Sequence, residues 1–166
     1  MSKHPPFSAR SLLRALIDGG VDFVVIGGLA AQAHGSPLIT EDLDICFDLD
    51  GGNLDRLASV LHDLAAMRRG MPDAIRAPLD RRALRAGNVF TLRTRFGDLD
   101  LLARPDPGLD YVQLRSRAAR FELAGTPVWI AALEDLIAMK RAAGRPKDLM
   151  AIEHLAALRE ELDRHD

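Results

Sequence analysis

The chain has 166 residues and a mass of 18.2 kDa, with 48% apolar and 28% charged residues. This is ordinary globular usage, which excludes disordered, collagen-like and disulfide-rich chains and suffices for a hydrophobic core. The 22 basic and 24 acidic residues leave a net charge of −2, so the overall charge does not indicate a nucleic-acid partner. The single cysteine, Cys46, excludes a cysteine-based zinc site and a redox pair.

The length and the absence of a linker predict one domain spanning residues 1–166. Residues 1–6 contain no apolar signal segment, and no apolar stretch approaches the roughly 18 residues of a membrane span. We therefore expect a cytoplasmic protein without a membrane partner.

The amino-terminal half is predicted to alternate short helices with strands. Ser8 can cap a first helix that ends at the Gly19–Gly20 pair, and a β-branched run with Val24, Val25 and Ile26 follows. The expected elements are a helix over 8–18, a strand over 21–26, a helical turn over 29–34, a strand over 43–49 and a helix over 53–67.

The carboxy-terminal half is predicted to contain hairpins and then helices. Residues 70–87 are rich in Pro, Gly, Ala and Arg and are expected to form a loop with one helical turn. The elements that follow are strands over 88–94 and 97–103, a helix over 109–118, strands over 120–123 and 127–130, and helices over 132–143 and 146–162. This order predicts an α+β fold with a small mixed sheet, and the helices of about 132–162 can form a helical subdomain.

Charges of the two signs are separated along the chain. Residues 41–63 contain seven acids and one base, and residues 68–95 contain eight arginines and two acids. This pattern is typical either of a cation site beside an anion-binding surface or of solvated helix and loop faces. The charge pattern alone leaves both interpretations open.

Two acidic strand motifs can bind a metal ion. Asp42 and Asp44 alternate with Leu43 and Ile45, so a strand would direct both carboxylates to one face. The segment 97–102 repeats the pattern, and its Asp100 is the candidate for a third carboxylate. Neighbouring carboxylates repel unless a cation lies between them, and Mg²⁺ prefers such oxygen ligands.

Gly27 and Gly28 lie at a predicted strand-to-helix junction. Glycines allow backbone amides to approach an anion, and a helix amino terminus favours phosphate. The surrounding sequence fits neither a P-loop nor a dinucleotide-binding motif.

Taken together, these motifs resemble the nucleotidyltransferase superfamily related to DNA polymerase β. The shared pattern is a glycine pair, thirteen intervening residues, the Asp42–Ile45 motif and a later strand aspartate. The sequence from Val24 to Pro37 is similar to that of minimal prokaryotic members of this superfamily, which include the AbiEii-type toxins of abortive-infection and toxin–antitoxin systems. The segments 132–140 and 145–149 extend the resemblance, so that it touches the chain from about residue 12 to 155.

The resemblance implies roles for individual residues. Gly27, Gly28 and Thr40 would contact the nucleoside triphosphate, together with Lys140 and Lys147. The metal ligands would be Asp42, Asp44 and Asp100. The catalytic residues would be these three acids with Lys140 and Asp148.

The implied activity is Mg²⁺- or Mn²⁺-dependent transfer of a nucleoside monophosphate from a triphosphate to an acceptor hydroxyl. The implied acceptor is tRNA or another RNA, and the implied partner is a cognate antitoxin protein. Two alternatives stay open: transfer to a small hydroxylated molecule, as in related antibiotic-modifying enzymes, and a catalytically weak binding module that keeps the fold. Leu38 departs from the pattern, because relatives carry a basic residue two positions before the threonine.

Overall fold

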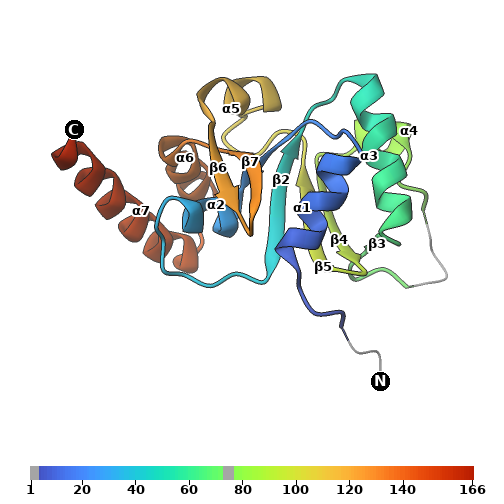
Figure 1. Ribbon diagram of the computed structural model, residues 1–166, viewed down its shortest axis with the longest axis horizontal. Coiled ribbons are helices and arrows are strands. Elements are labelled where there is room, and N and C mark those ends of the chain that lie inside the picture. Colours follow the sequence, from blue (N-terminus) through green and yellow to red (C-terminus); the bar gives the residue numbers. More distant parts are fainter. Residues whose placement is uncertain (1–3, 73–76) are drawn as a thin grey trace.

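A seven-stranded mixed sheet forms the centre of the computed structural model, which describes residues 4–72 and 77–166 (Figure 1). The sheet order is β3-β4-β5-β2-β1-β7-β6. The strands are β1 (Phe23–Ile26), β2 (Asp42–Phe47), β3 (Met67–Arg68), β4 (Val89–Thr94), β5 (Gly97–Leu102), β6 (Ala119–Leu123) and β7 (Thr126–Ile130).

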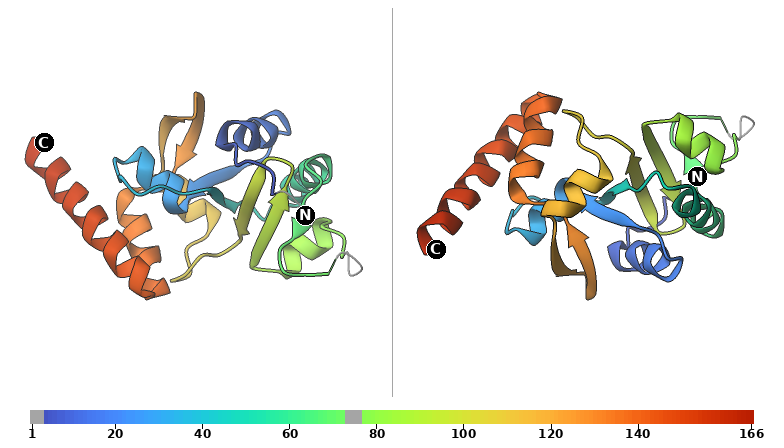
Figure 2. Two further views of the ribbon diagram at one scale, coloured as in Figure 1. Left: turned by 90° about the horizontal axis from the view of Figure 1, so that it is seen from below. Right: turned by 90° about the horizontal axis from the view of Figure 1, so that it is seen from above.

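Helices cover both faces of the sheet. The two views of Figure 2 place α1 and α5 on opposite sides of the β1–β2 region, with α7 at one end of the sheet and α3 and α4 at the other. The helices are α1 (Ala9–Asp18), α2 (Gly27–Ala33), α3 (Gly51–Asp63), α4 (Arg81–Ala86), α5 (Tyr111–Arg117), α6 (Leu133–Ala143) and α7 (Pro146–His165). None of the described helices is both long and apolar enough to cross a membrane.

The strand register positions the acidic motifs. β2 pairs with β5 in parallel, and Asp42 and Asp44 lie opposite Asp98 and Asp100. On the other side of β2, Ile26 at the end of β1 pairs with Asp44. The two acidic strands and the β1–α2 junction are therefore immediate neighbours in the middle of the sheet.

The predicted alternation decides which strand face is buried. Leu43, Ile45, Leu99 and Leu101 are fully buried in the core, whereas the aspartates between them stay partly exposed. A one-residue slip of either strand would place the carboxylates in the core, so the hydrophobic pattern fixes the register.

The α+β fold class predicted from the sequence is confirmed, with one local correction. The helix predicted over 53–67 is too long at its end: α3 stops at Asp63, and Ala65 has a positive φ of 53°. Apolar residues continue beyond Asp63, but Met67–Arg68 forms the short strand β3 against β4. The helical turn expected within 70–87 is α4, and residues 73–76 of that segment lie outside the described ranges.

Candidate active site

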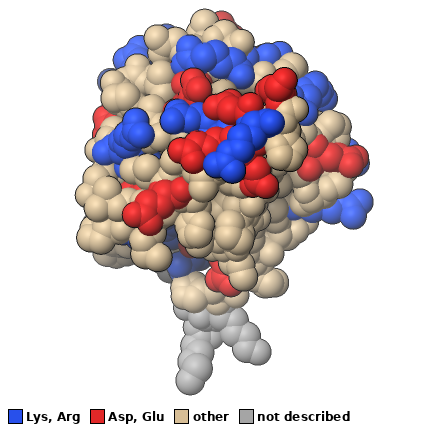
Figure 3. Space-filling model, turned by 90° about the vertical axis from the view of Figure 1, so that its left-hand side faces the viewer, with Lys and Arg blue, Asp and Glu red and all other residues tan. Residues whose placement is uncertain are grey.

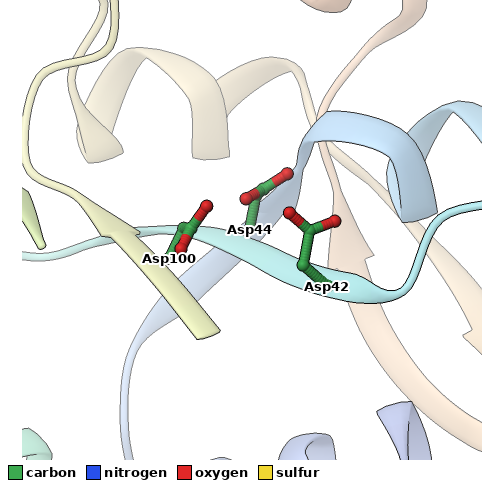
Figure 4. A group of neighbouring side chains, drawn as sticks. All are labelled: Asp42, Asp44 and Asp100. Atoms are coloured by element: carbon green, nitrogen blue, oxygen red, sulfur yellow. The ribbon is translucent and has the colours of Figure 1, made fainter. Parts of the chain in front are cut away.

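Three carboxylates from two neighbouring strands lie on one face of the sheet (Figure 4). Asp42 and Asp44 come from β2, and Asp100 comes from β5. One carboxylate oxygen from each of the three residues lies within 4.8 Å of the corresponding oxygens of the other two. The structure therefore brings together the three acids that the sequence predicts as metal ligands.

Two of these acids, Asp44 and Asp100, bind protons more tightly than free carboxylates do. Burial, followed by the charges of Asp42 and Asp100, raises the pKa of Asp44 from 3.8 to about 8, and Lys140 lowers it in part. Burial also raises the pKa of Asp100, against the opposing effect of Arg69. The cluster thus holds more negative charge than its surroundings neutralise.

This donor set fits a hard divalent cation. Carboxylate oxygens are the ligands that Mg²⁺ and Mn²⁺ prefer, and a divalent charge would relieve the repulsion that raises the pKa of Asp44. Asp42, Asp44 and Asp100 are the residues that could hold such an ion.

Gly27 and Gly28 begin α2 directly beside these acids. Gly27 has a φ of 69°, and a Cβ there would lie 2.0 Å from Oδ2 of Asp44. A Cβ on Gly28 would lie 2.9 Å from the Cβ of Thr40, whose hydroxyl donates a hydrogen bond to Oδ1 of Asp42. The glycine pair keeps the space beside the acids free of side-chain atoms, and only glycine adopts the Gly27 conformation at low cost.

Lys140 on α6 is held by a buried acid on α7. Its Nζ donates to Oδ1 of Asp148 at 3.2 Å, and the Arg145 side chain donates to Oδ2 of the same carboxylate at 2.7 Å. The Asp148 side chain is 0% exposed. Its burial raises its pKa, but the hydrogen bonds from Arg145 and Lys140 outweigh this effect, so the pKa lies below the usual value.

This arrangement separates the roles that Lys140 and Asp148 can have. The Lys140 side chain is 28% exposed, and its charge lowers the pKa of Asp44, so its field reaches the carboxylate cluster. Asp148 is shielded from solvent, so it can influence the carboxylate cluster only through the side chains of Lys140 and Arg145 that it binds. Lys147 is exposed near the start of α7 and makes no ion pair within the described ranges.

Arg69 is a member of this site that the sequence analysis placed only in a general basic block. Its guanidinium donates to Oδ1 of Asp100 at 2.8 Å and to the carbonyl of Leu92 at 3.0 Å, and it lies 3.4 Å from Asp98. Arg93 lies 3.6 Å from the other oxygen of Asp98. Arg69 directly follows β3, and the missed strand β3 is the reason why its position was not foreseen.

The loop between α2 and β2 contains Leu38, the position at which the sequence departs from the pattern that it otherwise resembles. Leu38 is 43% exposed, and its carbonyl accepts a hydrogen bond from the Gln32 side chain.

Cys46 on β2 is fully buried, and burial raises the pKa of its thiol to about 12, so it is not a nucleophile.

The fold of this chain is the one found in nucleotidyltransferases. It is similar to the lincomycin-bound lincosamide antibiotic adenylyltransferase LnuA, with a TM-score of 0.61, 16% identity, and coverage of 92% of this chain and 99% of that one. It is also similar to the antibiotic-resistance factor ANT(2'')-Ia, with a TM-score of 0.56, 16% identity, and coverage of 94% and 89%.

A third structural relative is a nucleotidyltransferase-like antigenic protein from Paracoccidioides brasiliensis. It has a TM-score of 0.55, 18% identity, and coverage of 92% of this chain and 77% of that one. No protein-family model and no curated protein matches the sequence. At these identities, the shared feature is the fold, and a more specific function has to be argued from the site.

Proposed function

We propose that this chain is a nucleotidyltransferase that moves a nucleoside monophosphate from a nucleoside triphosphate to an acceptor hydroxyl. The main support for this proposal is that oxygens of three carboxylates lie within 4.8 Å of one another, beside the glycine pair that begins α2. Mg²⁺ or Mn²⁺ would be held by Asp42, Asp44 and Asp100. When bound, the cation would neutralise charge on the phosphates and favour ionisation of the attacking hydroxyl.

The residues around the acids have separate tasks in this reaction. The acceptor oxygen bonds to the α-phosphorus, the bond to the β-phosphate oxygen breaks, and pyrophosphate leaves. Asp100 would accept the hydroxyl proton as a general base, and burial raises the pKa of its carboxyl above the usual value. Gly27 and Gly28 leave room for the phosphates beside Asp44 and Thr40.

Lys140 supplies positive charge to the same site. Its ammonium group binds the phosphates and stabilises the charge that develops on the leaving pyrophosphate. Asp148 is a positioning residue that directs this ammonium group through the 3.2 Å hydrogen bond. Lys147 is exposed and free to contribute a further phosphate contact.

A small hydroxylated molecule is the acceptor that the charges favour. Three arginines of the basic block pair with acids of the same chain: Arg69 with Asp98 and Asp100, Arg81 with Asp55, and Arg93 with Asp98. At the opposite end of the sheet from α4, the face that carries α7 also has basic and acidic side chains interspersed (Figure 3). Among the structural relatives, LnuA is bound to lincomycin and ANT(2'')-Ia to adenylyl-2''-tobramycin.

RNA is the second candidate acceptor. Arg82 and Arg85 on α4 are exposed and form no ion pair among the described residues, although Arg85 donates to the carbonyl of Leu49. These two arginines offer a short phosphate-binding segment, to which Arg81 would contribute by exchanging its ion pair with Asp55 for a phosphate, in line with the resemblance to AbiEii-type toxins. An RNA acceptor would be consistent with a toxin role and a cognate antitoxin, and growth arrest on expression would test that role.

Labelled triphosphates test the activity. Each nucleoside triphosphate, labelled at the α-phosphate, is incubated with Mg²⁺ and either total RNA or a panel of hydroxylated antibiotics. We expect label to move to an acceptor with wild-type protein and not with Asp42→Asn. If the wild-type protein transfers no label to any acceptor and binds no triphosphate, the proposed function is wrong.

A triple substitution distinguishes the two acceptors. Replacing Arg81, Arg82 and Arg85 by Gln should lower RNA affinity and flatten its salt dependence if RNA is the acceptor. With a small-molecule acceptor, transfer should be unchanged. Triphosphate binding by the same variant is the internal control for an intact site.

A further inference from the structure

Strand β6 forms one edge of the sheet. Within the described residues it pairs with β7 alone, and its residues Ala119, Arg120 and Glu122 are exposed. Both views of Figure 2 show the β6–β7 hairpin projecting from the body on the side away from α6 and α7. An exposed edge strand presents backbone groups that another strand can pair with.

The hairpin geometry identifies the outward-facing backbone groups. Ala131 donates its N–H to the carbonyl of Val25 on β1, so residues 127 and 129 of β7, which share its parity, also face β1. Residues 126, 128 and 130 face β6 and pair with residues 123, 121 and 119. The N–H and C=O groups of Arg120 and Glu122 therefore point away from the sheet.

These outward groups are self-complementary in one antiparallel register. If Phe121 lies opposite Phe121 of a second copy, Arg120 of each chain lies opposite Glu122 of the other, and both pairs can exchange two backbone hydrogen bonds. Shifting the register by two residues in either direction places Arg opposite Arg or Glu opposite Glu. Only the central register combines hydrogen bonding with charge attraction.

The two faces of such a ribbon would also match. Arg120 and Glu122 lie on the face of Trp129, over which the Arg120 guanidinium lies 5.2 Å from the ring centroid. Phe121 lies on the opposite face, where its ring makes an edge contact with His34 at 5.1 Å. Pairing of two copies would place two Phe121 rings side by side on one face and two Arg–Glu pairs on the other.

We propose that two copies of this chain associate through antiparallel pairing of their β6 strands, centred on Phe121, and so form one continuous sheet. The inference is independent of the proposed activity, because the three carboxylates lie on β2 and β5, away from this edge. A five-residue edge is a small interface, so we expect a weak dimer that dissociates on dilution.

A cysteine scan tests the register. The only native cysteine, Cys46, is fully buried and does not compete. A non-hydrogen-bonded antiparallel pair has Cα atoms about 4.5 Å apart, within disulfide range, so Phe121→Cys should form a disulfide-linked dimer on mild oxidation. Arg120→Cys and Glu122→Cys should not, since neither residue lies opposite itself. Cross-linking of Glu122→Cys but not Phe121→Cys would overturn the proposed register.

A charge exchange tests the pairing without cysteine. Sedimentation equilibrium between about 5 and 500 μM should show a wild-type dimer, and Glu122→Arg should weaken it at least tenfold, since it sets arginine opposite arginine. The double variant Arg120→Glu/Glu122→Arg restores opposite charges and should restore the dimer. Glu153→Arg on the exposed face of α7 is the matched control. A monomeric wild type, an unaffected Glu122→Arg, or a double variant that stays monomeric would refute the proposal.

Discussion

Replacing Asp44 by Asn should stabilise the metal-free fold at alkaline pH. The pKa of Asp44 rises from 3.8 to about 8 on folding, so the folded state binds this proton more tightly than the unfolded state. Stability from this group is therefore present below about pH 4 and is lost as pH rises toward 8. The displacement corresponds to at most about 6 kcal/mol, at about 1.4 kcal/mol for each pH unit.

A smaller change is expected in practice, because Asp42 and Asp100 share the cost of crowding. In EDTA at pH 8.5, we expect the free energy of unfolding of Asp44→Asn to be about 2 kcal/mol higher than that of the wild type. At pH 4.5 the two free energies should be nearly equal. Urea unfolding at both pH values measures the difference, and Asp163→Asn on exposed α7 is the control. A wild type whose stability does not fall between these pH values, or an Asn variant that is less stable at pH 8.5, would refute the reasoning.

Three other substitutions test the rest of the site. Gly27→Ala places a Cβ 2.0 Å from the Asp44 carboxylate and should abolish triphosphate binding measured by calorimetry, whereas Gly125→Ala, at a similar φ of 75° with no atom within 4 Å, should not. Lys140→Gln should lower kcat/KM by about 10- to 100-fold in the transfer assay while leaving the melting temperature within about 3 °C. Asp148→Asn should cost about 2 kcal/mol at pH 7 in urea unfolding, because it removes the acid of a buried ion pair. Since the pKa of Asp148 is lowered in the fold, that difference should shrink as pH falls below 4, and a constant difference would contradict the ionised-pair assignment.

Local patterns were sufficient to predict most of the sheet. The alternation of leucines with aspartates in β2 and β5 fixes which face each strand buries, and this requires no tertiary information. The Gly19–Gly20 and Gly27–Gly28 pairs likewise mark the ends of local elements. The end of α3 could not be predicted in this way, because apolar residues continue through Met67 and only pairing with β4 selects a strand there.

Side-chain partners distant in sequence could not be predicted. Asn53 is fully buried, and its side-chain amide hydrogen-bonds the backbone of Asp22 and the carbonyl of Asp48, which joins the beginning of α3 to the start of β1 and the end of β2. Nothing in the helical periodicity distinguishes it from a solvated residue. Lys140 and Asp148 come from separate helices, and their ion pair depends on the angle at which α6 and α7 meet.

The arginine pairings change what the basic block can mean for function. As a run of sequence, residues 68–95 are typical either of an anion-binding surface or of solvated helix and loop faces. In the fold, Arg69 lies against the acid that faces the proposed reaction centre, and its charge opposes the burial that raises the pKa of Asp100. An arginine in this position adjusts the basicity of one carboxylate and is unavailable to a long polyanion. The position of Arg69 therefore favours a role in setting the basicity of Asp100 over a role in an extended nucleic-acid interface. The tertiary structure is needed to distinguish these two roles, because an arginine in the sequence is compatible with both.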